Sequence, residues 1–278
     1  MKTKEKQLFA IIKLLALCLI TLVLSFPVII VFFTALKPPG EIFTAQPAIL
    51  PHLFTLQNYI DLFRIREFPH YLLNSFLVAV LTASATLIIA LLAACAIVWM
   101  RFPAKKMIAK SILFTYMFPE ILMVIPLYLL CFRLDLLDTK AGLVLTYLSF
   151  TLPFSIWMLK SFFESISIEL IEAALLDGCN YLRCLIRVVL PVSLPGVAAV
   201  LIFSIILAWS EYLFANTLII SDTNRTMAIG LQTLLGYYRT DYGLLTAAGM
   251  VMVTPVLVFF IAVQKYFIKG LLVGAVKE

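Results

Sequence analysis

The sequence predicts an all-α membrane protein with six transmembrane helices, because it is very apolar, contains six long apolar stretches and carries basic loops between them. Of its 278 residues, 63% are hydrophobic and only 13% are charged, and the mean hydropathy is +1.08. Soluble domains carry about 25% charged residues. This chain has too few charges to cover a surface in water, so we expect the apolar excess to face lipid.

Six stretches are long enough to cross the bilayer core, which takes about 20 apolar residues in a helix. They are residues 14–36, 72–100, 111–131, 142–158, 196–219 and 244–267. Prolines interrupt several of them, which favours bends where backbone groups can face a cavity. The first stretch follows three lysines, as in a signal peptide, but it exceeds the roughly 7–15 apolar residues of a cleaved signal. A retained first span is therefore expected.

Lys and Arg are distributed unevenly between the two sides of the predicted spans. If the N-terminus is inside, the inner segments hold about twice as many Lys and Arg as the outer loops, which is the bias of cytoplasmic segments. Both termini and the loop 160–195 are therefore predicted to be cytoplasmic, and residues 1–278 form one transmembrane domain. Basic loops also explain the net charge of +6, so no nucleic-acid partner is expected.

The sequence offers little for catalysis or metal binding. The five cysteines have no framework spacing, and His52 and His70 are the only histidines. HExxH, CxxC and GxSxG motifs are all absent, so we predict neither a metal site nor an intramembrane enzyme. The P-loop GxxxxGK[ST] is absent as well. Any ATP that drives this protein must therefore be hydrolysed by another chain.

The loop 160–195 holds the most structured polar sequence of the chain. Ser167 is suited to cap a helix over about 168–177, with Glu169 in the first turn, where the helix dipole favours an anion. Gly178 follows as the residue best able to adopt the left-handed C-terminal conformation. Asn180 can cap a second helix that runs to about Val189 and stops before Pro191.

The first of these helices has two distinct stripes at 100° per residue. One consists of Ile168, Ile171 and Leu175, and the other of Glu169, Glu172 and Leu176. We expect the first stripe to pack on the membrane domain. The second stripe, flanked by Ala173 and Ala174, suits docking into a groove of a partner. The alternative is an amphipathic interfacial helix with ordinary caps.

The spacing of this loop resembles the EAA loop of bacterial ABC-importer permeases. Glu172-Ala173-Ala174, three residues, Gly178, nine residues, Val188, one residue and Leu190-Pro191 follow that pattern. Four further segments resemble the carbohydrate-uptake branch and its subunit similar to MalG: residues 54–59, 125–128, 209–212 and 269–277. Two positions depart from the branch, since Ser167 replaces a common proline and Ile171 a frequent acidic residue.

The resemblance implies a type I ABC-importer permease whose loop is a coupling helix seated in a cytoplasmic ATPase. The residues that it assigns to ATPase coupling are Glu169, Glu172, Ala173, Ala174, Asp177, Gly178, Leu190 and Pro191. It also implies a second, different permease subunit, two ATPase subunits that bind ATP and Mg, and an extracytoplasmic substrate-binding protein. This chain would bind no cofactor itself, would lie in the bacterial inner membrane, and would carry a sugar or oligosaccharide, with a peptide, glycerol-phosphate or polyol as the alternative substrates.

Two carboxylates inside predicted spans are candidates for the substrate pathway. Glu120 in the third span is costly in lipid, at about 2.5–3.5 kcal/mol, so it is expected to face protein or water. It can line the pathway, join helices, or couple protons in a self-sufficient secondary transporter, the alternative function. The fifth span contributes a group that suits sugar rings and equally suits an interfacial belt: Trp209, Glu211, Tyr212 and Asn216.

Overall fold

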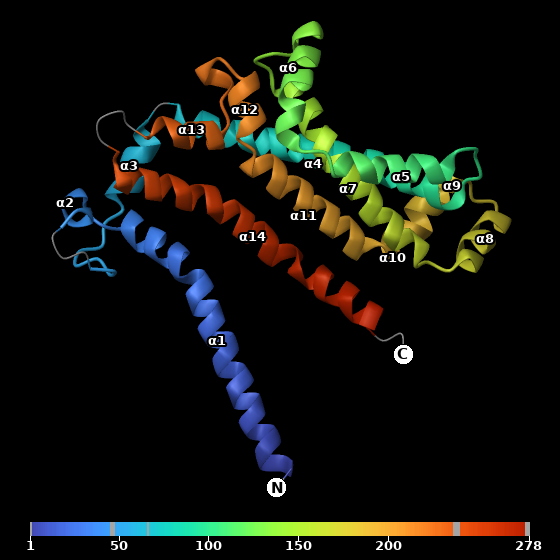
Figure 1. Ribbon diagram of the computed structural model, residues 1–278, viewed down its shortest axis with the longest axis horizontal. Coiled ribbons are helices and arrows are strands. Elements are labelled where there is room, and N and C mark those ends of the chain that lie inside the picture. The colour runs from blue at the N-terminus through green and yellow to red at the C-terminus, as the bar shows by residue number, and fades with distance from the viewer. Residues whose placement is uncertain (1, 45–47, 66, 236–239, 276–278) are drawn as a thin grey trace. The chain divides into compact units, whose positions relative to one another are not determined.

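The computed structural model describes residues 2–44, 48–65, 67–235 and 240–275, which contain helices and no strand (Figure 1). The chain divides into two compact units, residues 1–65 with 231–254 and residues 66–230 with 255–278. The α-helices are α1 (Lys2–Ala35), α2 (Pro39–Ile42), α3 (Gln57–Arg64), α4 (Phe68–Trp99), α5 (Lys105–Tyr116), α6 (Val124–Arg133), α7 (Lys140–Glu164), α8 (Ile168–Leu176), α9 (Tyr181–Cys184), α10 (Leu190–Val192), α11 (Leu194–Ser210), α12 (Leu213–Leu218), α13 (Met227–Thr233) and α14 (Tyr242–Ala275). Two 3₁₀-helices, η1 (Glu120–Met123) and η3 (Asp222–Asn224), and one π-helix, η2 (Leu185–Val189), complete the described helices.

Six candidate spans are present in the described residues when each bent helix pair counts as one. Four are continuous: Gln7–Ala35, Phe68–Trp99, Lys140–Glu164 and Tyr242–Ala262. The other two are bent, Lys105–Tyr116 with Glu120–Arg133 by 99° and Tyr181–Val192 with Leu194–Ser210 by 87°. The prediction of an all-α membrane protein is thus confirmed, with four to six candidate spans, and the third span bends, as its interrupting prolines favour. The second bent pair begins at Tyr181, within the loop 160–195, so it does not coincide with the predicted span 196–219.

The break in the third span lies at Pro119, which adopts an extended backbone conformation (φ −60°, ψ 124°). Proline has no N–H to donate, and it pushes the preceding residue away from helical geometry. The fifth predicted span, 196–219, is also interrupted. There α11 ends at Ser210, Glu211 is extended, and α12 begins at Leu213. By contrast, Pro153 lies within the continuous helix α7.

The core of the unit formed by 66–230 and 255–278 is built by α4, α7 and α11, which pack side by side (Figure 1). Small residues on α4 are fully buried in this packing: Ala79, Ala83, Ala90 and Ala94. Small side chains let membrane helices approach closely, and hydroxyl groups can bond across the interface. The Thr86 and Thr151 hydroxyls form such a bond at 2.7 Å between α4 and α7.

Asp138 fastens the loop between α6 and α7 to the loop after α12. Its Oδ1 accepts the backbone N–H groups of Ile220 and Ser221, each at 3.0 Å, and the Ser221 hydroxyl at 3.0 Å. Burial tends to raise the pKa of the Asp138 carboxyl, but the hydrogen bonds from Ser221 and Ile220 outweigh it and hold the pKa below its usual value. The two loops are therefore held together by charge-assisted hydrogen bonds to Asp138, and we call this connection the joint at Asp138.

Asn58 fastens the end of α1 in the other unit. Its side-chain amide donates to the carbonyls of Ala35 at 2.9 Å and Lys37 at 2.8 Å. The last carbonyls of a helix have no partner within it, so this side chain satisfies groups that would otherwise be unpaired. Gly243 at the start of α14 lies so close that a Cβ there would meet Asn58 Oδ1 at 2.5 Å.

Candidate functional site

The helix predicted in the loop 160–195 is present as α8, Ile168–Leu176, and its start matches the prediction. Ser167 occupies the N-cap position, but its hydroxyl donates to the Glu169 carboxylate and makes no bond to the backbone. This bond from Ser167 is the main cause that lowers the pKa of the Glu169 carboxyl below its usual value. At the start of α8, the Ser167 hydroxyl therefore stabilises the charged form of the Glu169 carboxylate instead of capping the backbone.

The exit from α8 is a left-handed turn at Gly178, as predicted, with φ +84°. The Gly178 N–H donates to the Leu175 carbonyl at 3.1 Å, and the Cys179 N–H donates to the Ala174 carbonyl at 3.1 Å. These bonds satisfy the last carbonyls of the helix. No heavy atom lies within 4 Å of a Cβ built on Gly178, so the demand for glycine comes from the backbone angle alone.

One side of α8 is anchored in the core beside α7 and α9. Ile171 is 1% exposed and Ala174 is 8% exposed, and Leu175 packs against the same cluster. The predicted packing stripe was partly wrong, because Ile168 is 51% exposed. Ala174, expected beside the docking stripe, instead faces the core.

The opposite side of α8 is open and combines acid with apolar surface. We call the exposed residues Glu169, Glu172, Ala173 and Leu176 the α8 face. Leu176 is 89% exposed, and Asp177 beside it is exposed as well. This side of α8 is therefore left uncovered by the rest of the described chain.

The second helix of the loop begins as predicted and ends differently. Asn180 Oδ1 accepts the Arg183 N–H at 2.8 Å and caps α9. The predicted stop before Pro191 was wrong, because helical backbone continues through η2 and α10 to Val192. The π-helix η2 lies just before Pro191. Proline has no N–H to donate, so the regular α-helical hydrogen-bond pattern cannot continue unchanged through this position. Leu190 is half-buried and Pro191 is exposed.

Glu120 lies at the bend of the third span, beside a cavity of about 80 Å³. The cavity is lined by Thr115, Tyr116, Phe118, Glu120, Ser149, Phe150, Phe203 and Leu207. The Glu120 side chain is exposed and has no hydrogen-bond partner among the described residues. We call this the Glu120 cavity.

Aromatic rings form the wall behind the Glu120 cavity. The Phe154 ring lies 4.3 Å from the Phe203 ring and 5.3 Å from the Tyr116 ring, measured between centroids. These rings come from α5, α7 and α11, so sequence reasoning missed them. Only the packing of three helices, each separated in sequence, brings them together.

The other predicted pathway residues do not line the Glu120 cavity. The Glu211 carboxylate accepts the N–H groups of Phe214 at 2.8 Å and Ala215 at 3.0 Å, and so caps α12. Trp209 is 4% exposed, Tyr212 is half-buried, and Asn216 is exposed.

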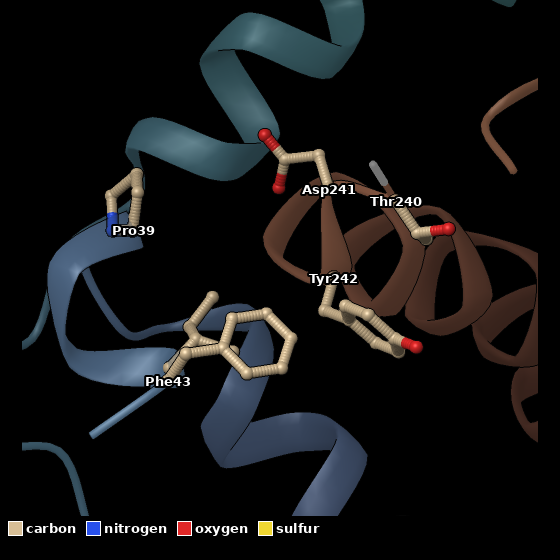
Figure 2. A pocket seen from close by; sticks show the side chains of 6 residues that line it. Pro39, Phe43, Thr240, Asp241 and Tyr242 are labelled. Carbon is tan, nitrogen blue, oxygen red and sulfur yellow. The ribbon is translucent and has the colours of Figure 1, made fainter. Parts of the chain in front are cut away.

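A second cavity, of about 350 Å³, lies between α2 and the start of α14 (Figure 2). Figure 2 shows the rings of Phe43 and Tyr242 side by side, and their centroids are 5.1 Å apart in an edge-to-face arrangement. Asp241 Oδ1 accepts the N–H groups of Gly243 at 2.9 Å and Leu244 at 3.1 Å, which caps α14. This arrangement fixes the helix start and was not predicted from the sequence.

Comparisons with known proteins give the chain a family and a fold. The family described as "Binding-protein-dependent transport system inner membrane component" matches residues 86–273. The inner membrane ABC transporter permease protein YcjP of Escherichia coli K12 is 32% identical over 279 residues, covering 100% of both chains. The trehalose permease protein SugB of Mycobacterium tuberculosis is 31% identical over 90% of this chain and 92% of its own.

A solved structure shares the fold of the chain over nearly its whole length. It is a bacterial ABC transporter involved in the import of the acidic polysaccharide alginate, with a TM-score of 0.83, 23% identity and coverage of 95% of this chain and 98% of that chain. The chain therefore belongs to the inner membrane components of binding-protein-dependent transport systems, and it is a multi-pass permease of the bacterial inner membrane.

Proposed function

We propose that this chain is the membrane-spanning permease of an ATP-driven importer for a sugar or oligosaccharide. The observation that carries the proposal is the α8 face, an exposed acidic and apolar surface on a helix anchored to the core. The sugar class is supported by relatives named for trehalose, diacetylchitobiose and sulfoquinovosyl glycerol transport.

In this proposal the α8 face docks on a cytoplasmic ATPase subunit. Both chain termini lie in the cytoplasm, two ATPase subunits hold the ATP and Mg, and a second, different permease completes the pathway. An extracytoplasmic binding protein delivers the substrate. The family description, which names dependence on a binding protein, supports the last of these partners.

The packing of α8 explains how docking can move the membrane helices. Because Ile171 belongs to a buried cluster with residues of α4, α7 and α9, a force on the α8 face is transmitted to this core rather than absorbed by a loose loop. The helix breaks at Pro119 and Glu211 are the places where the unit can change shape with least loss of helix bonding. The chain itself performs no bond chemistry.

Reversal of charge on the α8 face tests the proposal. Glu172→Lys is expected to abolish ATP-dependent sugar uptake and copurification of the ATPase, while the amount of chain in the membrane stays unchanged. Glu67→Lys, at another exposed position, serves as the matched control. Normal uptake by Glu172→Lys would contradict the coupling role, and uptake by the purified chain alone on a proton gradient would establish secondary transport instead.

A further inference from the structure

The Glu120 cavity carries a negative charge and no positive one. Its eight lining residues include one carboxylate and no Lys, Arg or His. An anionic solute that approached the cavity would therefore be repelled by the Glu120 carboxylate.

The remaining lining groups suit a polyhydroxylated ring. Thr115 and Ser149 contribute hydroxyl groups, Tyr116 a phenol, and Phe150 and Phe203 apolar ring faces. A carboxylate without a partner accepts hydrogen bonds from hydroxyl groups, and such charge-assisted bonds are stronger than neutral ones. The aromatic ring faces can pack against the apolar face of a sugar ring.

We propose that the Glu120 cavity is a subsite that accepts an edge of an uncharged saccharide and rejects saccharides that carry a carboxylate or sulfonate. The inference rests on the proposed function and adds the charge class of its substrate. The volume of about 80 Å³ holds a few hydroxyl groups and part of one ring, so the rest of the sugar lies outside this cavity. Selection by charge therefore acts on one ring of a longer solute.

The first experiment identifies the class of solute. A strain that lacks this chain and its parent are grown on a mixture of neutral oligosaccharides and anionic ones (alginate oligosaccharides, sulfoquinovosyl glycerol), and depletion of each solute is measured by mass spectrometry. Loss of uptake of neutral saccharides alone is expected. Loss of uptake of an anionic saccharide would overturn the inference, but the proposed function as a sugar importer would stand. Loss of no saccharide would overturn the proposed function, and the inference with it.

The second experiment tests Glu120 itself in the full transporter complex. Uptake of the identified saccharide is compared with uptake of its uronic acid, and the ratio is the readout, because it does not depend on how much complex assembles. Glu120→Gln is expected to lower this ratio by about tenfold, the effect of one hydrogen bond to a charged group. Glu67→Gln is the control and is expected to leave the ratio unchanged. An unchanged ratio in Glu120→Gln would show that another group selects the charge.

Discussion

At the scale of the residue, three positions are fixed by the backbone angle or by hydrogen bonds to backbone N–H groups rather than by packing. Gly178 is required by its positive φ. The carboxylates of Glu211 and Asp241 both accept two N–H groups at the start of a helix. The Glu211 bonds favour a positioning role for this residue, in which it holds the α11–α12 break, over direct contact with substrate. Its role in the pathway therefore stays a prediction.

The left-handed angle at Gly178 predicts a sharp difference between two substitutions. Gly178→Val forces a β-branched residue into that conformation at a cost of about 1–2 kcal/mol, and is expected to shift the α8 face and reduce ATP-driven uptake. Asn tolerates the same conformation, and space around the position is open, so Gly178→Asn should retain most uptake. Equal uptake by the two variants would show that the turn has no role in coupling.

At the scale of the element, α8 divides into a buried side and an exposed side with separate tasks. Ile171 joins the helix to the core and Leu176 extends away from it. Stability and partner binding should therefore depend on different residues of the same helix. The sequence predicted this division, but it assigned Ile168 and Ala174 to the wrong sides. The reason is that nine residues of helix at 100° per residue leave the packed direction undetermined until neighbouring helices are in place.

Two alanine substitutions on α8 are expected to separate these tasks. Ile171→Ala removes a buried side chain and should destabilise the chain by about 2–5 kcal/mol, which lowers the midpoint of thermal unfolding of the purified protein. Leu176→Ala should leave that midpoint unchanged and weaken binding of the ATPase, measured by copurification. If Leu176→Ala lowered the unfolding midpoint instead, the leucine would belong to the core rather than to the α8 face.

At the scale of the molecule, hydrogen bonds join the α6–α7 loop to the loop after α12 at one end of the unit that contains α4, α7 and α11. Helix α8 lies at another end of the same unit (Figure 1). Asn74 on α4 adds to the joint at Asp138 by donating to the carbonyls of Thr223 at 2.8 Å and Arg225 at 2.9 Å. Three segments far apart in sequence are thereby tied together. The exposed apolar residues near the third-span bend, such as Met117 and Ile125, suit lipid or a second permease.

The joint at Asp138 predicts a stability that depends on pH. A carboxyl whose pKa is lower in the folded protein stabilises the fold above its ordinary pKa of about 3.9, and this contribution is lost as the pH falls through the folded value. Thermal unfolding of the purified protein should show a loss of stability below about pH 4 that Asp138→Asn diminishes, together with a lower midpoint at pH 7. Asp135→Asn, at an exposed carboxyl with positive φ, is the control. Identical pH profiles for the wild type and Asp138→Asn would rule out this role.

The sequence by itself determined the class of protein, the approximate spans, and the cap and turn of the α8 loop at Asn180 and Gly178, because these depend on local composition and on residues a few positions apart. The charge of Glu120 inside a span was also visible as a functional candidate. Only the tertiary structure decided where the third span bends, which side of α8 is buried, and which rings and hydroxyl groups accompany Glu120. The last two of these features depend on packing between helices that are far apart in the sequence, and such contacts leave no periodic signal in a single sequence.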